Sequence, residues 1–228
     1  MASTVAAERS HRARLIWLGR IGYVEALERQ QAAARSLASG GEETLFLLEH
    51  EPVYTLGRNA STQDILWTSE TRRAAGIEVF ETNRGGKVTY HGPGQLVGYP
   101  IVDLSPDRKD VKRYVTDLEE VLIRALSEFG ITASRSDRKD RVTSVWVGND
   151  KIAAIGVHIA RWITTHGFAL NIANEALNNF SGIVPCGIFD GGVTSIERES
   201  GRSVSVASVA KTVARTFGEV FGREIIEL

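Results

Sequence analysis

One cysteine and one lysine are the side chains in this sequence best suited to covalent chemistry. Cys186 is the only cysteine of the 228 residues, and it stands between Pro185 and Gly187 in a stretch without periodicity. Such a setting can present a sulfur at the rim of a pocket. A free cysteine is more often a small buried hydrophobe, so composition alone favours an inert thiol. A catalytic Cys186 therefore needs a partner that ionises it.

Two kinds of partner are available to Cys186. A thiol with the ordinary pKa of about 8.5 is only a few per cent ionised at pH 7, so it needs a neighbouring base or cation. His91 or His166 would form a Cys–His pair, and Lys151 would form a Cys–Lys pair. Lys151 begins the apolar run 152–157, where burial would lower the pKa of its amine. The alternative is an ordinary hairpin lysine with its ammonium in water, because spacing alone does not place Lys151 beside Cys186.

A glycine-rich segment, Arg84 to Gln95, is the third chemically unusual feature. Its sequence, RGGKVTYHGPGQ, has two glycine clusters around a strand-like turn. Glycines let backbone N–H groups approach a ligand, and Arg84, Tyr90 and His91 offer polar groups to a carbonyl or phosphate. The segment is therefore either a substrate cradle or a hairpin whose polar side chains cap their own loop. It lacks dinucleotide-binding spacing, and no phosphate loop occurs in the sequence, so neither NAD nor a P-loop nucleotide is predicted.

Composition argues against several other classes of function. The five histidines form no pair at helical ligand spacing and there is one cysteine, so no metal site is predicted. With 27 basic and 28 acidic residues, the net charge of −1 gives no field for nucleic acid or an anionic membrane. Basic clusters at 108–113 and 135–141 are interpreted as solvated faces, with a docking patch for an acidic partner as the alternative. The longest apolar runs are far shorter than the roughly 18 residues of a membrane-spanning helix, which predicts a soluble protein.

The N-terminal residues and the cysteine count bear on compartment and organisation. Residues 1–13 lack the apolar run of a secretory signal and are predicted to be a flexible tail. One cysteine forms no intramolecular disulfide, which suits a reducing cytoplasm. The length fits one domain of generous size. We therefore expect a cytoplasmic monomer with a single catalytic domain over residues 14–228.

The elements that must position these residues are mixed without regular alternation. Hydrophobic periodicity predicts strands at 14–18, 44–49, 77–81 and 95–103, and helices at 24–37, 110–129 and 204–221. Three further strands, 144–147, 151–160 and 162–171, should form an antiparallel meander. Residues 54–59, 134–141 and 174–190 are expected to be loops or irregular. The predicted class is α+β, with helices covering one antiparallel or mixed sheet.

Ordered motifs give the chain a family resemblance. They are Arg84 to Gln95, Lys151-Ile152-Ala153-Ala154-Ile155-Gly156 and Pro185-Cys186-Gly187-Ile188, with HGFALN at 166–171 and GVTS at 192–195. In this combination, over about residues 45–195, the chain resembles the octanoyltransferases of lipoate biosynthesis. The resemblance implies the fold shared by biotin and lipoate protein ligases.

The resemblance also implies an activity and its residues. Cys186 would carry octanoyl as a thioester, and Lys151 would activate it. The implied substrate-site residues are Arg84, Gly85, Gly86, Lys87, Val88, Thr89, Tyr90, His91, Ala154, Ile155, Gly156, Gly167, Phe168 and Ala169. Octanoyl would pass from octanoyl-acyl carrier protein to a lysine of a lipoyl domain, as found in 2-oxoacid dehydrogenase complexes and the glycine cleavage H protein.

A thioester is already activated, so this transfer needs no ATP and no cofactor is expected. The backbone N–H of Cys186, that of a neighbouring glycine, or His91 would hold the oxyanion that develops. One rival is an ATP-dependent lipoate or biotin ligase of the same fold, in which Cys186 is incidental. The other rival is a non-enzymatic module that binds acyl chains or lipoyl domains.

Overall fold

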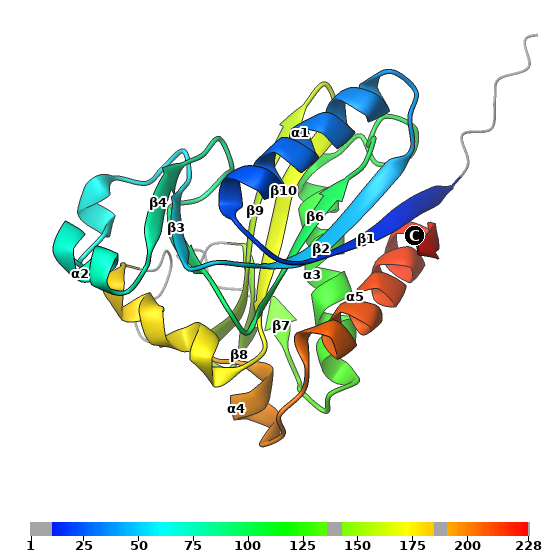
Figure 1. Cartoon of the computed structure of the whole chain (residues 1–228). Helices are drawn as coiled ribbons and strands as arrows, with labels where there is room; N and C mark the ends of the chain where they lie inside the picture. Colours follow the sequence, from blue (N-terminus) through cyan, green and yellow to red (C-terminus); the bar gives the residue numbers. More distant parts are fainter. Residues whose placement is uncertain (1–10, 136–142, 185–190, 228) are drawn as a thin grey trace, which may run out of the picture.

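The computed structural model describes residues 11–135, 143–184 and 191–227, which form two β-sheets with helices packed around them (Figure 1). The larger sheet has the spatial order β11 (Glu224–Glu227), β1 (Arg12–Ile21), β2 (Glu43–His50), β6 (Gln95–Ile101), β10 (Ile163–Asn171), β9 (Asp150–Ala160), β8 (Ser144–Val147) and β7 (Ser134–Arg135). The smaller sheet has the order β4 (Glu78–Glu81), β3 (Val53–Leu56) and β5 (Val88–His91).

The larger sheet is mixed. Strand β1 pairs parallel with both β2 and β11, while β2, β6, β10, β9 and β8 pair antiparallel in that spatial order. The last three of these strands are the predicted meander. A mixed sheet with flanking helices confirms the predicted α+β class, whereas the smaller sheet of β4, β3 and β5 differs from the single sheet that was expected.

Helices cover both faces of the larger sheet (Figure 1). Helix α1 (Tyr23–Ala38) lies on one face, and α3 (Val111–Ser127) and α5 (Val206–Phe221) lie on the other. Strand β2 shows why both faces are covered, because alternate residues enter different cores. Phe46 and Leu48 pack in the core under α1, whereas Leu45 and Leu47 pack in the core under α3 and α5.

Local sequence signals explain the long helix α3. Asp110 caps its first turn by accepting a hydrogen bond from the backbone N–H of Arg113 at 3.0 Å. Apolar residues then recur at helical spacing, with Leu118, Leu122 and Ala125 fully buried. The short helices are α2 (Ser69–Ala74) and α4 (Ile196–Ser200), with 3₁₀ turns at Thr62–Asp64 and Asn174–Gly182.

Several predicted elements differ from the structure. Residues 54–59 were expected to be a loop, but β3 covers Val53–Leu56. Pro52 only precedes this strand, a position where proline removes no ladder hydrogen bond. Residues 174–182 form a 3₁₀ helix rather than irregular chain, and β7 falls within the predicted loop 134–141. Strand β1 begins at Arg12, so it includes the last two residues of the predicted tail 1–13. Residues 1–10 of that tail and residues 136–141 of the predicted loop lie outside the described residues.

In the described part of the chain, no helix has both the length and the apolar character needed to span a membrane.

Candidate functional site

A cavity of about 420 Å³ lies against β9 and β10, a volume typical of small-molecule sites. Lys151 and most of the predicted substrate-site residues line it: Arg84, Gly85, Gly86, Lys87, Val88, Thr89, His91, Ala154, Ile155, Gly156, Gly167, Phe168 and Ala169. Segments that are far apart in the sequence therefore share one cavity.

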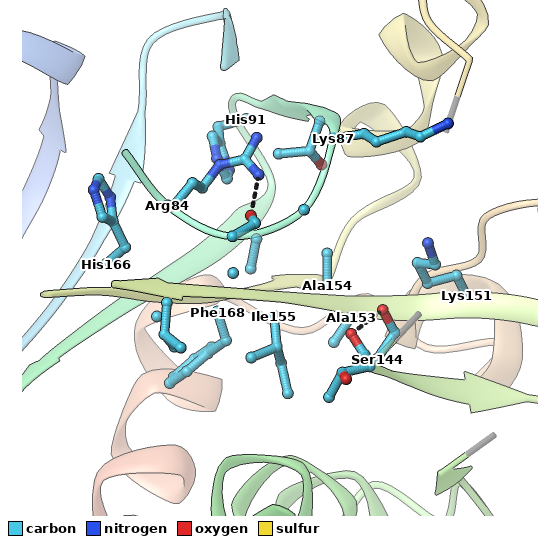
Figure 2. A pocket seen from close by; sticks show the side chains of 18 of the residues that line it. Arg84, Lys87, His91, Ser144, Lys151, Ala153, Ala154, Ile155, His166 and Phe168 are labelled. Carbon is cyan, nitrogen blue, oxygen red and sulfur yellow. Dashed lines mark hydrogen bonds between the residues drawn. The ribbon is translucent and has the colours of Figure 1, made fainter. Parts of the chain in front are cut away.

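Small side chains form the floor of this cavity. In the antiparallel pair of β9 and β10, Ala154 lies opposite Ala169 and Gly156 lies opposite Gly167. Figure 2 shows Ala154 on the side of the strand that faces the glycine-rich loop, and Ile155 on the opposite side. Because side chains alternate across a strand, these small residues leave a trough on one face of the sheet.

A β-bulge brings Lys151 to the same face as this floor. The register of β8 and β9 shifts next to Trp146, which lies opposite Lys151, so that Ile152 has no residue opposite it. In a regular strand, positions 151 and 154 would point to opposite faces because they are three residues apart. The extra residue of the bulge turns the two side chains to the same face of the sheet. Figure 2 shows Lys151 and Ala154 on the same side.

Lys151 is firmly placed and nearly buried, with 7% of its surface exposed. Its backbone N–H donates to the Gly192 carbonyl at 2.9 Å, and its carbonyl accepts from the N–H of Thr194 at 3.0 Å. Its Nζ lies 5.0 Å from the centroid of the Trp146 ring. The amine is thus held at one end of the cavity against an aromatic face.

Cys186 lies outside the described residues, within the stretch 185–190. The residues on either side are anchored. The N–H of Val184 donates to the Asp64 carbonyl at 2.8 Å, and the N–H of Gly192 donates to Asp150 Oδ1 at 2.6 Å. Because Asp150 is the neighbour of Lys151, the chain that follows Cys186 returns to the lysine strand. The pairing of Cys186 with Lys151 stays a prediction.

The glycine-rich loop forms the opposite wall and is held by its backbone. The N–H of Gly85 donates to the Val157 carbonyl of β9 at 2.9 Å. A side chain at Gly57 would place its Cβ 2.4 Å from the Gly86 carbonyl oxygen, so this close approach requires glycine. The loop is therefore fixed over the floor.

Arg84 holds this loop to the smaller sheet. Its guanidinium donates to Thr55 Oγ1 from Nε at 3.2 Å and from Nη2 at 2.8 Å, and Nη2 also donates to the Thr55 carbonyl at 2.6 Å. Nη1 donates to the Gly85 carbonyl at 2.9 Å, the bond drawn in Figure 2. These bonds give Arg84 a structural role in the loop, and its positive charge contributes to the cavity's field.

A buried hydrogen-bond chain runs below the cavity from the glycine-rich segment to the lysine strand. Gln95 Nε2 donates to the Tyr90 carbonyl at 3.2 Å and to Asn171 Oδ1 at 2.9 Å. Asn171 Nδ2 donates in turn to the carbonyl of Thr194, whose N–H bonds Lys151. The side chain of Gln95 thus links three segments of the site.

This chain also fixes the protonation of His91. Both amide hydrogens of Gln95 are donated elsewhere, so its Oε1, 2.8 Å from His91 Nδ1, accepts a hydrogen from that nitrogen. His91 Nε2 is then an acceptor and faces Thr55 Oγ1 at 3.5 Å. Burial, with contributions from His50 and Arg84, lowers the pKa of His91 well below its usual value. In this tautomer the neutral ring has no N–H left for an oxyanion, which favours the other two candidate donors, the backbone N–H groups of Cys186 and of a neighbouring glycine.

Tyr90 does not line the cavity, although the motif included it. Its ring packs edge-on against Tyr54 and Phe180, with centroids 5.9 and 5.7 Å apart, and its hydroxyl accepts a hydrogen bond from Asn179 Nδ2 at 2.9 Å. The side chain thus belongs to the core of the smaller sheet.

Several lining residues were not among the substrate-site residues that the resemblance implies: Tyr23, Gln95, Tyr99, Asn171, Phe180, and His166, which was considered only as an alternative partner of Cys186. Gln95, His166 and Asn171 lie inside the recognised motifs, which was the available signal. Tyr23 and Tyr99 come from α1 and β6, where no motif marked them as site residues.

Two more histidines are buried near the cavity: His166 lines the end distant from Lys151, and His50 contacts Tyr99, another lining residue. His50 Nε2 lies 2.8 Å from the Tyr99 hydroxyl and its Nδ1 lies 3.1 Å from the Ile21 carbonyl. Burial lowers the pKa of His50 to about 4, and burial, then Arg84, lowers the pKa of His166 to about 4. Both rings are therefore neutral at pH 7. Over the described ranges, no group of three His, Cys, Asp or Glu residues is placed to hold a metal ion.

Comparison with known proteins identifies the family to which this chain is similar. The family model "Lipoyl protein ligase A/B catalytic domain" matches residues 22–218. The chain is 49% identical over 211 residues to an octanoyltransferase of Caldicellulosiruptor bescii, covering 92% of this chain and 91% of that one. It is 48% identical over 217 residues to an octanoyltransferase of Myxococcus xanthus, covering 92% of this chain but only 60% of that longer one.

The fold agrees with these matches. A crystal structure of lipoate-protein ligase A bound with ATP superimposes with a TM-score of 0.80 at 19% identity, covering 95% of this chain and 88% of that one. The predicted biotin/lipoate protein ligase-like fold is thereby confirmed. The chain belongs to the lipoyl protein ligase A/B catalytic domain family, within which its similar relatives are octanoyltransferases.

Proposed function

We propose that this protein is an octanoyltransferase, which moves an octanoyl group from an acyl donor protein to a lysine of a lipoyl domain. The observation that carries the proposal is the single cavity that the glycine-rich loop, β9 and β10 share, with Lys151 at one end. Relatives that are 48–49% identical over 92% of the chain support the same reaction. Octanoyl-acyl carrier protein is the proposed donor.

In the first step, Lys151 takes the proton of the Cys186 thiol. The thiolate attacks the donor's thioester carbonyl, a new C–S bond forms to Cys186, and the carrier leaves as a thiol that receives the proton from Lys151. The burial of Lys151 supports this role, because removal from water favours a neutral, proton-accepting amine. The cation–π geometry with Trp146 stabilises the protonated form that follows.

In the second step, the acceptor lysine attacks the octanoyl–Cys186 thioester. A C–N bond forms, the C–S bond breaks, and the proton lost by the attacking amine returns through Lys151 to the Cys186 sulfur. The acyl group occupies the trough of small residues during both steps. The thioester supplies the driving force, so the exchange requires no ATP.

The test is to incubate the protein with octanoyl-loaded acyl carrier protein in the absence of ATP and to measure its intact mass. We expect an octanoyl adduct in the native protein that is absent in Cys186→Ala and lost when a lipoyl domain is added. The same mass should then appear on the lipoyl domain. No adduct under these conditions would contradict the proposal.

Two further outcomes identify the rivals. Formation of octanoyl-adenylate from free octanoate and ATP would favour a ligase in which Cys186 is incidental. Tight binding of octanoate or of the lipoyl domain without turnover would favour a binding module.

A further inference from the structure

A second cavity, of about 330 Å³, lies under α1 beyond the far end of the substrate cavity. Leu27 and Ala34 from α1, Ala160 from β9 and Ile163 from β10 give it apolar surface, and polar side chains such as Gln31, Arg35 and Arg161 also line it. Among the described residues, His166 is the one that lines both cavities. Its imidazole therefore stands between them, at the left end of Figure 2.

His166 is held in this position against its backbone preference. Its φ is +57°, in the left-handed region that side chains other than glycine rarely adopt. Its backbone N–H donates to Gln30 Oε1 at 2.8 Å, and its Nε2 lies 2.7 Å from Asn83 Oδ1. The ring is 2% exposed. Residues held in strained conformations cluster at functional positions, and the strain here aims the ring at the cavity boundary.

The ring also suits an apolar neighbour. With Asn83 Oδ1 as acceptor, the hydrogen of the neutral imidazole lies on Nε2 and points away from the trough. Burial lowers the pKa of His166 to about 4, so no charge faces the cavity at pH 7. An uncharged, fixed ring is a suitable contact for the methyl end of an acyl chain.

The length of the trough matches an eight-carbon chain. Its floor runs along β9 from Ala154 past Gly156 to the level of Val157, whose backbone is the register partner of His166. Three residues of a strand span about 10 Å. The seven C–C bonds of an extended octanoyl group span about 9 Å at ordinary bond lengths and angles. An octanoyl chain whose first carbon lies over Ala154 therefore ends at the imidazole, and the carbonyl end then faces the part of the cavity that Lys151 lines.

We propose that His166 sets the acyl-chain length, as a wall that closes the octanoyl site and separates it from the second cavity. The inference rests on the proposed function and specifies the substrate of the same site. Removal of the ring would join the two cavities, so the methyl end of a longer chain would enter the space between α1, β9 and β10. Each methylene transferred to such apolar surroundings improves binding by about fourfold.

The test compares acyl carrier proteins loaded with C8, C12 and C16 chains, with the rate of Cys186 adduct formation measured by intact mass. The native protein should prefer C8 to C12 by at least about tenfold, because overfilling a closed pocket is unfavourable. In His166→Gly this preference should fall at least about tenfold, because the C12 rate rises relative to the C8 rate. An unchanged ratio of the C8 and C12 rates would overturn the inference.

Two further variants distinguish loss of the His166 ring from relief of backbone strain and from misfolding. Arg161 also has a positive φ, +52°, and it lines the second cavity but not the substrate cavity, so Arg161→Gly should leave the preference unchanged while the His166 ring still closes the octanoyl site. A matching change there would overturn the inference. His166→Asn provides a second variant should His166→Gly fail to fold, since asparagine tolerates a left-handed backbone and is shorter than histidine.

Filling the second cavity gives an independent test. Ala34→Phe alone should leave C8 and C12 rates unchanged, because Ala34 lines only the second cavity. In the His166→Gly background it should restore the preference for C8. Failure of the double variant to restore it would show that the longer chain does not use this space. Failure of every variant and of the native protein to form a C8 adduct would instead contradict the proposed function.

Discussion

The two faces of the β9–β10 pair differ in function: one packs in an apolar core and the other forms a cavity. On the face that meets α3 and α5, Ile152 and Leu170 are fully buried in an apolar core. On the other face, alanine and glycine leave a trough, and polar groups such as His91, Gln95 and Asn171 are buried beneath it in hydrogen bonds. One face supplies stability through packing, while the other gives up packing for a cavity. Substitutions should therefore affect either activity or stability, depending on the face.

The largest effect is expected from Lys151→Met on the cavity face. A proton acceptor in catalysis contributes about 10²- to 10⁴-fold to the rate, so adduct formation on Cys186 should slow by that factor. The free energy of unfolding, measured in urea, should change by less than about 1 kcal/mol, because methionine occupies similar volume. Lys112→Met, at an exposed position on α3, is the matched control and should leave both quantities unchanged. An unchanged rate in Lys151→Met would remove its proposed role.

On the core face, Leu170→Ala should lower the free energy of unfolding by about 2–5 kcal/mol, because it creates a cavity in a fully buried site. The rate per folded molecule should stay within about threefold. Leu66→Ala, at a leucine that is 60% exposed, should change stability by less than about 0.5 kcal/mol. A large loss of activity at full folding in Leu170→Ala would show that the two faces are not separate.

Buried histidines near the cavity should also make stability depend on pH, and His50 at the end of β2 is one of them. Burial lowers the pKa of His50 to about 4 in the folded protein, whereas the unfolded chain titrates near 6.5. Between these values the unfolded chain binds the extra proton, so stability is fully present above pH 6.5 and decreases as the pH falls toward 4. His50→Gln should reduce this slope by up to about 1.4 kcal/mol per pH unit in urea titrations at pH 7, 6 and 5. Leu170→Ala should lower stability at all three values and keep the native slope.

The smallest effect should come from Gly156→Ala on the cavity floor. An added Cβ would lie 3.0 Å from the Gly85 carbonyl oxygen and 3.2 Å from Arg84 Cδ, so the loop must shift by a few tenths of an ångström. We expect the adduct rate to fall about tenfold, since misplacement of a substrate by a small distance is costly. Gly22→Ala, where an added Cβ meets nothing within 4 Å, is the control. Equal rates in the two variants would show that the loop is not in contact with substrate.

The sequence predicted which segments form the cavity better than it predicted which of their side chains point into it. Periodicity predicted the meander of β8, β9 and β10, and the motifs predicted most of the residues that line the cavity. Contiguous motifs do not show alternation, however, so Tyr90 was included although it packs in the smaller sheet's core. Residues 54–59 were expected to be a loop where β3 forms, because the sequence does not show that Pro52 lies just outside a strand. Tyr23 and Tyr99 reach the cavity through tertiary packing alone.

The left-handed backbone conformation of His166 was likewise not predictable from the sequence. No local signal marks it, because it is held by side chains from α1 and from the loop that precedes Arg84. The face on which Lys151 lies was also undetermined, since residue spacing does not reveal a bulge.

That bulge has a consequence for how this site tolerates change over evolution. The side on which Lys151 lies depends on the number of residues between it and Ala154, whatever their identity. Substitutions at Ile152 alter packing and leave the amine on the cavity side. Deletion of this one residue would turn Lys151 toward α3 and α5, and the amine would be lost to the site while the composition of β9 stayed almost the same. In this strand, residue count is under tighter constraint than residue type.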